Sequence, residues 1–194
     1  INCDISDPSN YRSILHLDLW LKKNNVPGIC NIDTRLITNK IRSKGAPKGG
    51  IIEGPINNKK TAYCLKEIKK WKGLNGLDLA IDVSRKNVKI YKSKKKSKLK
   101  VVAIDYGIKQ NILNCLLDLN LEVILVPAKT SAEKILTYSP NGIFLSNGPG
   151  DPKATGKYAI PIIKRLIKTR IPIFGICLGH QLISLAMGAK TKKM

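Results

Sequence analysis

The stretch from residue 171 to residue 182, I-P-I-F-G-I-C-L-G-H-Q-L, decides the predicted fold of this chain. It begins as an apolar, β-branched strand, continues through Gly175, Cys177 and Gly179, and ends in a helical pattern over residues 180–187. A strand, a sharp turn and a helix in this order form a nucleophile elbow, here with cysteine in place of the serine of G-x-S-x-G. Glycines on both sides of the nucleophile suit a turn too tight for side chains.

Cys177 is therefore the candidate catalytic nucleophile. At the N-terminus of a helix, unpaired backbone N–H groups favour the thiolate, which is the reactive form of a cysteine. The alternative for this residue is a buried cysteine that only fills space at the end of a strand.

A second loop, S-N-G-P-G-D-P at residues 146–152, follows an apolar run that predicts a strand. In a parallel sheet both loops leave the same rim, because each follows the carboxyl end of a strand. We expect the N–H groups of Gly148, Gly150 and Asp151 to stay free. An acyl-transfer site needs two such donors for its oxyanion, and the amide of Leu178 is the second candidate. Taken alone, this loop is an ordinary turn.

Strands and helices alternate regularly from residue 99 onwards. The pattern predicts an α/β fold with a doubly wound parallel sheet, preceded by the remainder of a smaller α/β leader domain. The predicted strands cover residues 101–104, 121–126, 142–145 and 171–174, and the predicted helices cover residues 109–119, 131–138 and 158–169. In the leader we predict helices at 16–21, 34–44 and 61–71 and short strands at 29–32 and 49–54.

Three segments follow from this pattern: a leader domain over 1–90, a basic linker over 91–98, and a sheet domain over 99–194. The first residue is not methionine, and the last one follows directly on a helix and a basic tail. We therefore expect the chain to be cut at both ends.

The composition is strongly basic, with 35 Lys and Arg against 13 Asp and Glu and a formal net charge of +22. The densest run, residues 86–100, contains a single aromatic residue, whereas single-strand readers interleave several. We interpret the charge as a solvated surface and expect no nucleic-acid partner. Five scattered cysteines favour neither a zinc site nor a disulfide framework, and suit a reducing cytoplasm. No apolar run approaches the ~20 residues that cross a bilayer, so we expect no membrane partner.

The two loops together resemble those of the class I glutamine amidotransferase family. Within that family the similarity is greatest to the small subunits of carbamoyl-phosphate synthetases. Five further motifs carry the resemblance through the leader and the sheet: N-I-D-T-R at 31–35, K-G-A-P-K-G-G at 44–50, G-L-N-G-L-D-L-A at 73–80, D-Y-G-I-K-Q-N-I at 105–112 and V-P-A-K-T-S-A-E at 126–133.

The resemblance implies that Cys177 attacks the side-chain amide of L-glutamine, forms a thioester and releases ammonia. It also implies that Gly148 and Gly150 line the glutamine site, with Gly148 as an oxyanion donor. Leu178 is implied to donate through its backbone, and Gln181 to hold the substrate. Ammonia is then used by a separate large subunit, which binds ATP and Mg and makes carbamoyl phosphate for arginine and pyrimidine synthesis. No cofactor or metal is expected in this chain.

The general base is the point at which the chain departs from the family pattern. It has only two histidines, His16 and His180. We interpret His180 as a packing residue or a family-specific contact, and His16 as a partly exposed helix residue. The family carries its histidine and glutamate as H-x-E further downstream, so we expect the 194-residue chain to be inactive alone. Two alternatives remain: another thiol hydrolase with the same elbow, and a non-catalytic basic binding module.

Overall fold

The computed structural model describes residues 1–45, 47–73, 76–93 and 99–191. They form two compact units, Ile1–Trp71 and Lys72–Lys193. The first unit contains α1 (Leu17–Lys23), α2 (Thr34–Lys44) and α3 (Asn58–Lys70). The second contains α4 (Leu79–Val83), β1 (Lys89–Tyr91), β2 (Lys100–Asp105), α5 (Gln110–Asp118), β3 (Glu122–Pro127), α6 (Ala132–Leu136), β4 (Gly142–Leu145), α7 (Pro152–Ile167), β5 (Ile173–Gly175) and α8 (Leu178–Ala186).

The helices of the first unit are capped by side chains at their N-termini. Asp33 accepts a hydrogen bond from the amide of Leu36 in α2, and Asn57 accepts one from the amide of Lys60 in α3. Such caps satisfy backbone donors that have no partner inside the helix. None of the three helices contains a buried residue, so this unit has little core of its own.

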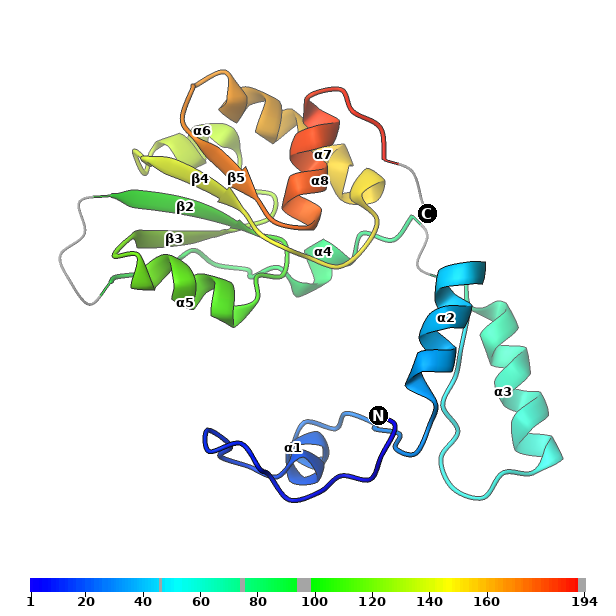
Figure 1. Cartoon of the computed structure of the whole chain (residues 1–194). Coiled ribbons are helices and arrows are strands. Elements are labelled where there is room, and N and C mark those ends of the chain that lie inside the picture. Colours follow the sequence, from blue (N-terminus) through cyan, green and yellow to red (C-terminus); the bar gives the residue numbers. More distant parts are fainter. Residues whose placement is uncertain (46, 74–75, 94–98, 192–194) are drawn as a thin grey trace. The chain divides into compact units, whose positions relative to one another are not determined.

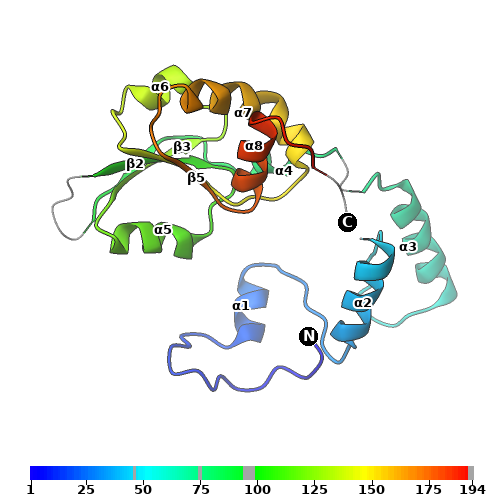
Figure 2. The same ribbon diagram turned by 45° about the horizontal axis from the view of Figure 1, so that its top comes forward.

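The second unit is built on a five-stranded sheet in the order β1-β3-β2-β4-β5 (Figure 1). The strands β3, β2, β4 and β5 run parallel, and β1 pairs antiparallel with β3. Helices cover both faces: α5 lies on one, and α6, α7 and α8 lie on the other (Figure 2). The predicted doubly wound α/β fold is confirmed, with one antiparallel edge strand that the sequence did not predict.

The core of this unit follows the two-residue period of its strands. On the side of α7 and α8, the buried strand residues include Val102, Ile104 and Leu145. On the side of α5, Ala103, Val123 and Phe144 are buried with Leu113 of that helix. Both faces are therefore packed, as expected for central parallel strands.

The division between the units lies earlier than the predicted boundary near residue 90. Residues 72–91 belong to the sheet unit, because α4 packs on α7 and β1 extends the sheet beyond β3. Tyr91, which was placed in the predicted basic linker, is the last residue of β1. The rest of that linker, from residue 94 to residue 98, lies outside the described residues.

Several predicted elements differ from those observed. The two short strands predicted at 29–32 and 49–54 do not form, since an isolated extended segment has no neighbour to complete its hydrogen bonds. The helix predicted over 158–169 begins six residues earlier, at Pro152, where Asp151 caps it. The helix over 34–44 and the strand over 142–145 have the predicted bounds.

Candidate functional site

Cys177 stands between β5 and α8 with a backbone conformation that few non-glycine residues adopt. Its φ is 53° and its ψ is −109°, and it occupies the N-cap position of α8. Its thiol is free and exposed. A residue held in such a region costs about 1–3 kcal/mol, and strain of this kind is common at nucleophile elbows. The predicted kinked junction is confirmed, and the alternative of a buried space-filling cysteine is wrong.

The two elbow glycines are required because backbone approaches backbone on both sides of the cysteine. A Cβ added to Gly175 would lie 2.6 Å from the carbonyl carbon of Gly179. The amide of Gly179 donates to the carbonyl of Ser146 over 3.1 Å. This bond joins the elbow directly to the end of β4. The steric reason for G-x-C-x-G that the sequence indicated is therefore visible in the contacts.

The glycine loop after β4 lies against the elbow. A Cβ on Gly148 would stand 2.9 Å from Cδ2 of Leu178 and 2.2 Å from the carbonyl oxygen of Tyr106. Among the described residues, the amides of Gly148, Gly150 and Leu178 donate no hydrogen bond. The structure thus brings Gly148 beside the residue that follows Cys177, with unpaired donors on both segments.

The far side of the glycine loop is braced by residues 76–79. Gly150 has a φ of 101°, and a Cβ there would lie 2.9 Å from the amide nitrogen of Leu79. The amide of Asp151 donates to the carbonyl of Leu77 over 3.0 Å, and its carboxylate accepts from the amide of Gly76 over 3.1 Å. The expectation that the Asp151 amide stays free is therefore wrong, because it binds this brace.

A side-chain hydrogen bond also joins residues 76–79 to the first turn of α7. The buried Thr155 of α7 donates from its hydroxyl to Oδ1 of Asp78 over 2.9 Å. Sequence reasoning did not single out either residue. The one sequence signal for this contact is the G-L-D-L stretch at 76–79, which belongs to the family-like motif at 73–80 but had no role assigned to it.

The residues that follow the nucleophile in α8 are exposed. Gln181 lies one turn beyond the nucleophile, and its backbone N–H donates to the carbonyl of Cys177 over 3.0 Å. His180 is also exposed, so its interpretation as a packing residue is wrong. In the part of the chain that the structure describes, its ring makes no ion pair or hydrogen bond with a carboxylate.

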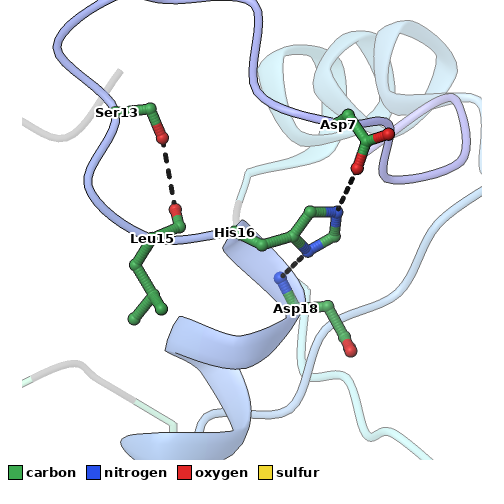
Figure 3. Close-up of polar contacts among 5 residues, drawn as sticks. All are labelled: Asp7, Ser13, Leu15, His16 and Asp18. Carbon is green, nitrogen blue, oxygen red and sulfur yellow. Dashed lines mark hydrogen bonds and ion pairs between the residues drawn. The ribbon is translucent and has the colours of Figure 1, made fainter.

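The other histidine, His16, is engaged inside the first unit (Figure 3). Its Nδ1 accepts a hydrogen bond from the amide of Asp18 over 3.2 Å and so caps α1. Its Nε2 lies 3.9 Å from the Asp7 carboxylate. Nearby, the hydroxyl of Ser13 donates to the carbonyl of Leu15. Nδ1 is therefore occupied as the cap of α1 while Nε2 faces Asp7, which is a structural role.

The backbone carbonyl of Tyr106 lies next to Gly148 of the glycine loop. Its ring is fully buried, and its hydroxyl has no hydrogen-bond partner among the described residues. Burial raises the pKa of this phenol well above its ordinary value, and the nearby Tyr158 raises it further. Tyr106 is therefore neutral and contributes to the site through its backbone carbonyl.

The described residues contain no cluster of three or more His, Cys, Asp or Glu side chains that could hold a metal ion. Within the same residues, no helix is both long enough and apolar enough to cross a membrane.

Two parts of the chain match models of known protein families. Residues 102–194 match the family model described as "Glutamine amidotransferase class-I". This segment, from the second residue of β2's apolar run to the end of the chain, contains both the elbow and the glycine loop.

The leader makes the assignment more specific. Residues 1–51 match the model described as "Carbamoyl-phosphate synthase small chain, CPSase domain". Carbamoyl phosphate synthase small chains of Agrobacterium fabrum, Rhizobium meliloti and Bradyrhizobium diazoefficiens are 49%, 48% and 50% identical to this chain, over 98% of its length. The chain is therefore homologous to these small chains, and it spans 51% of the length of each.

A solved structure from Thermoplasma acidophilum, described as one subunit of a GMP synthase, is also similar. It has a TM-score of 0.42 and 25% identity, over 47% of this chain and 46% of that one.

Proposed function

We propose that this chain supplies the glutamine-hydrolysing site of a carbamoyl-phosphate synthase. The observation that carries the proposal is the strained, exposed Cys177, beside which the amides of Gly148 and Leu178 have no partner among the described residues. The similarity to carbamoyl phosphate synthase small chains and to the glutamine amidotransferase model supports the side-chain amide of L-glutamine as the substrate.

In the proposed reaction the thiolate of Cys177 attacks the amide carbon of glutamine, and a carbon–sulfur bond forms. The carbonyl oxygen takes up the negative charge, which the N–H groups of Gly148 and Leu178 stabilise by hydrogen bonds. Each such donor lowers the barrier by about 3 kcal/mol. The carbon–nitrogen bond then breaks, the nitrogen takes a proton and leaves as ammonia, and water hydrolyses the thioester to glutamate and the free thiol.

Gln181 and Gly150 are proposed to complete the substrate site. Gln181 is exposed one turn beyond the nucleophile. Gly150 shapes the loop through its positive φ. The proton transfers are assigned, by the resemblance alone, to a histidine oriented by a glutamate.

The partner in this proposal is a large subunit that consumes the ammonia. Using ATP and Mg bound on its own surface, it would form carbamoyl phosphate, the precursor of arginine and pyrimidines, in the cytoplasm. This chain carries no phosphate-binding loop of its own.

The test is selective labelling of the chain with a chloroketone analogue of glutamine, followed by peptide mass spectrometry. We expect the label on Cys177 and protection by free glutamine. Cys115, which is also free and exposed, is the internal control and should react only at the rate of an ordinary thiol. Labelling of both cysteines at equal rates would contradict the proposal. Faster acylation of Cys177 by simple esters than its alkylation by the chloroketone analogue of glutamine would favour a different thiol hydrolase.

A further inference from the structure

The loops after β2 and β4 meet at the topological switch point of the sheet. The chain passes from β2 to its neighbour β3 on one side and later returns to β4 on the other side. In doubly wound sheets the loops diverge at this point and leave a crevice, which is where ligands commonly bind. Here the two loops are joined instead.

The side chain of Asn147 makes that junction. Its Nδ2 donates to the carbonyl of Gly107 over 3.0 Å, and its Oδ1 accepts from the amide of Lys109 over 3.0 Å. A planar amide that both donates to and accepts from one backbone segment fixes the distance and the orientation of the two loops.

The preceding residue adds two bonds to the same junction. The buried Ser146 accepts from the amide of Tyr106 through Oγ over 2.9 Å, and the same hydroxyl donates to the carbonyl of Asn147 over 2.7 Å. Residues 146 and 147 are thus held on both sides, and Gly148 follows them directly in the chain.

The backbone of Gly148 is closely packed on two sides. It lies between the carbonyl of Tyr106 and the side chain of Leu178, where even a Cβ would collide with both. A displacement of about 1 Å at a reacting centre costs roughly 100-fold in rate. The bonds of Asn147 are therefore well placed to determine where the Gly148 amide points.

We infer that Asn147 is a positioning residue for the cysteine site. Its side-chain amide closes the switch-point crevice and holds the Gly148 N–H toward the charge that develops during attack by Cys177. This inference rests on the function proposed above.

The chain offers a matched control at the opposite end of the same strand pair. Asn141 directly precedes β4, and its Oδ1 accepts from the amide of Lys100 in β2 over 2.8 Å. Both asparagines thus bridge β2 and β4 with a side-chain amide. Only Asn147 does so on the rim that carries Cys177 and Gly148.

The experiment compares the 194-residue chain with its Asn147→Ala, Asn147→Asp and Asn141→Ala variants. Asn147→Asp keeps the acceptor for the Lys109 amide and loses the donor to the Gly107 carbonyl, with almost no change in shape. Three quantities are measured: saturation kinetics of Cys177 labelling by the chloroketone analogue of glutamine, its rate with iodoacetamide, and the urea midpoint. With the chloroketone, the thiolate adds first to the carbonyl carbon and forms an oxyanion, and chloride leaves as the sulfur moves to the methylene carbon. Iodoacetamide loses iodide by direct displacement at its methylene carbon and develops no oxyanion, so it reports the thiol alone.

We expect both Asn147 variants to lose roughly 10- to 100-fold in the limiting chloroketone rate, with the half-saturating concentration and the iodoacetamide rate within about twofold of the parent. Asn141→Ala should keep all three kinetic values. Equal chloroketone rates in the Asn147 and Asn141 variants would overturn the inference. So would loss of folding in both Asn147 variants, because the residue would then be purely structural. A parent chain without selective labelling of Cys177 would instead remove the proposed function and this inference with it.

Discussion

The carbonyl oxygen of Leu145 occupies the space in which Gly179 would carry a side chain. A Cβ built on Gly179 would lie 2.2 Å from that oxygen, well inside any permitted contact. The end of β4 and the first turn of α8 are thus packed backbone to backbone. This contact places the elbow against the glycine loop.

We therefore predict that Gly179→Ala destabilises the sheet unit by at least about 1–3 kcal/mol, the usual cost of overpacking. Gly142→Ala, at the other end of β4, is the control, since its added Cβ would meet only ordinary contacts at 3.8 Å. Urea unfolding followed by circular dichroism gives both values. Equal stability of the two variants would show that α8 moves freely away from β4.

The conformation of Cys177 predicts an inverted preference between glycine and alanine. At a φ of 53°, alanine retains the strain that glycine avoids, so Cys177→Gly should be more stable than Cys177→Ala by about 0.5–2 kcal/mol. Cys115 lies inside α5 and provides the opposite case, because alanine is favoured over glycine in a helix by about 1 kcal/mol. The urea midpoints of the glycine and alanine variants at Cys177 and Cys115 test both orders of stability. The same order at both positions would mean that Cys177 is not strained.

Alkaline pH should expose the burial of Tyr106. An unfolded tyrosine ionises near pH 10, whereas burial raises the pKa of Tyr106 in the folded chain far above that value. The folded state therefore keeps a proton that the unfolded state releases. Stability is full below about pH 10 and falls above it, by about 1.4 kcal/mol per pH unit for this group.

Tyr106→Phe should make this alkaline loss less steep and cost little at neutral pH, because the hydroxyl has no partner among the described residues. Tyr158→Phe is the comparison. Burial raises the pKa of Tyr158 as well, and Asp78 raises it further, but its hydroxyl donates to Asp78. That variant should therefore also lose stability at neutral pH. Urea midpoints between pH 7 and pH 11 test both expectations, and an unchanged alkaline slope for Tyr106→Phe would contradict the first.

An apolar groove of about 620 Å³ runs along the α5 side of β4 and β5. Phe174 lines it with 64% of its surface exposed, stacked on Phe144 with 6.2 Å between ring centroids. Exposed apolar patches on an edge strand promote association. We expect Phe174→Asp to reduce the binding of an environment-sensitive apolar dye and the light scattering of concentrated protein. Ile14→Asp, at a 99% exposed position of the other unit, should change neither.

The two histidines predict slow turnover by the chain alone. His16 is bonded around α1, and His180 has no carboxylate partner among the described residues to orient it as a base. We expect the 194-residue chain to release ammonia from glutamine far more slowly than an intact amidotransferase. A coupled glutamate assay measures this. Enzyme-like turnover that His180→Ala abolishes would show that His180 is the base after all.

Local patterns predicted the central strands and the elbow because those features depend on neighbours in sequence. β4 is an apolar run between a turn and a glycine loop, and G-I-C-L-G carries its own steric logic. The edge strand β1 was missed because it is only three residues long and lies within the lysine-rich run at 86–100, and only pairing with β3 makes it a strand. The start of α7 was missed although Asp151 and Pro152 are a normal helix beginning.

The contacts that shape the site could not be predicted in the same way. Asn147 reaches residues 38 and 40 positions away, and Asp78 bonds to Thr155 across 77 positions. Nothing in the local composition of either stretch indicates its partner. Such contacts depend on strand order, which fixes which loops become neighbours.

The brace behind the glycine loop determines where a shortened recombinant protein could begin. The family-model match starts at residue 102. Expression from there would delete β1, α4, the bonds from Gly76 and Leu77 to Asp151 of the loop, and the bond from Asp78 to Thr155 of α7. The shortened protein would still contain Cys177, but its glycine loop would lack the hydrogen bonds to Gly76 and Leu77. A version starting at Lys72, the first residue of the sheet unit, would retain all of these bonds.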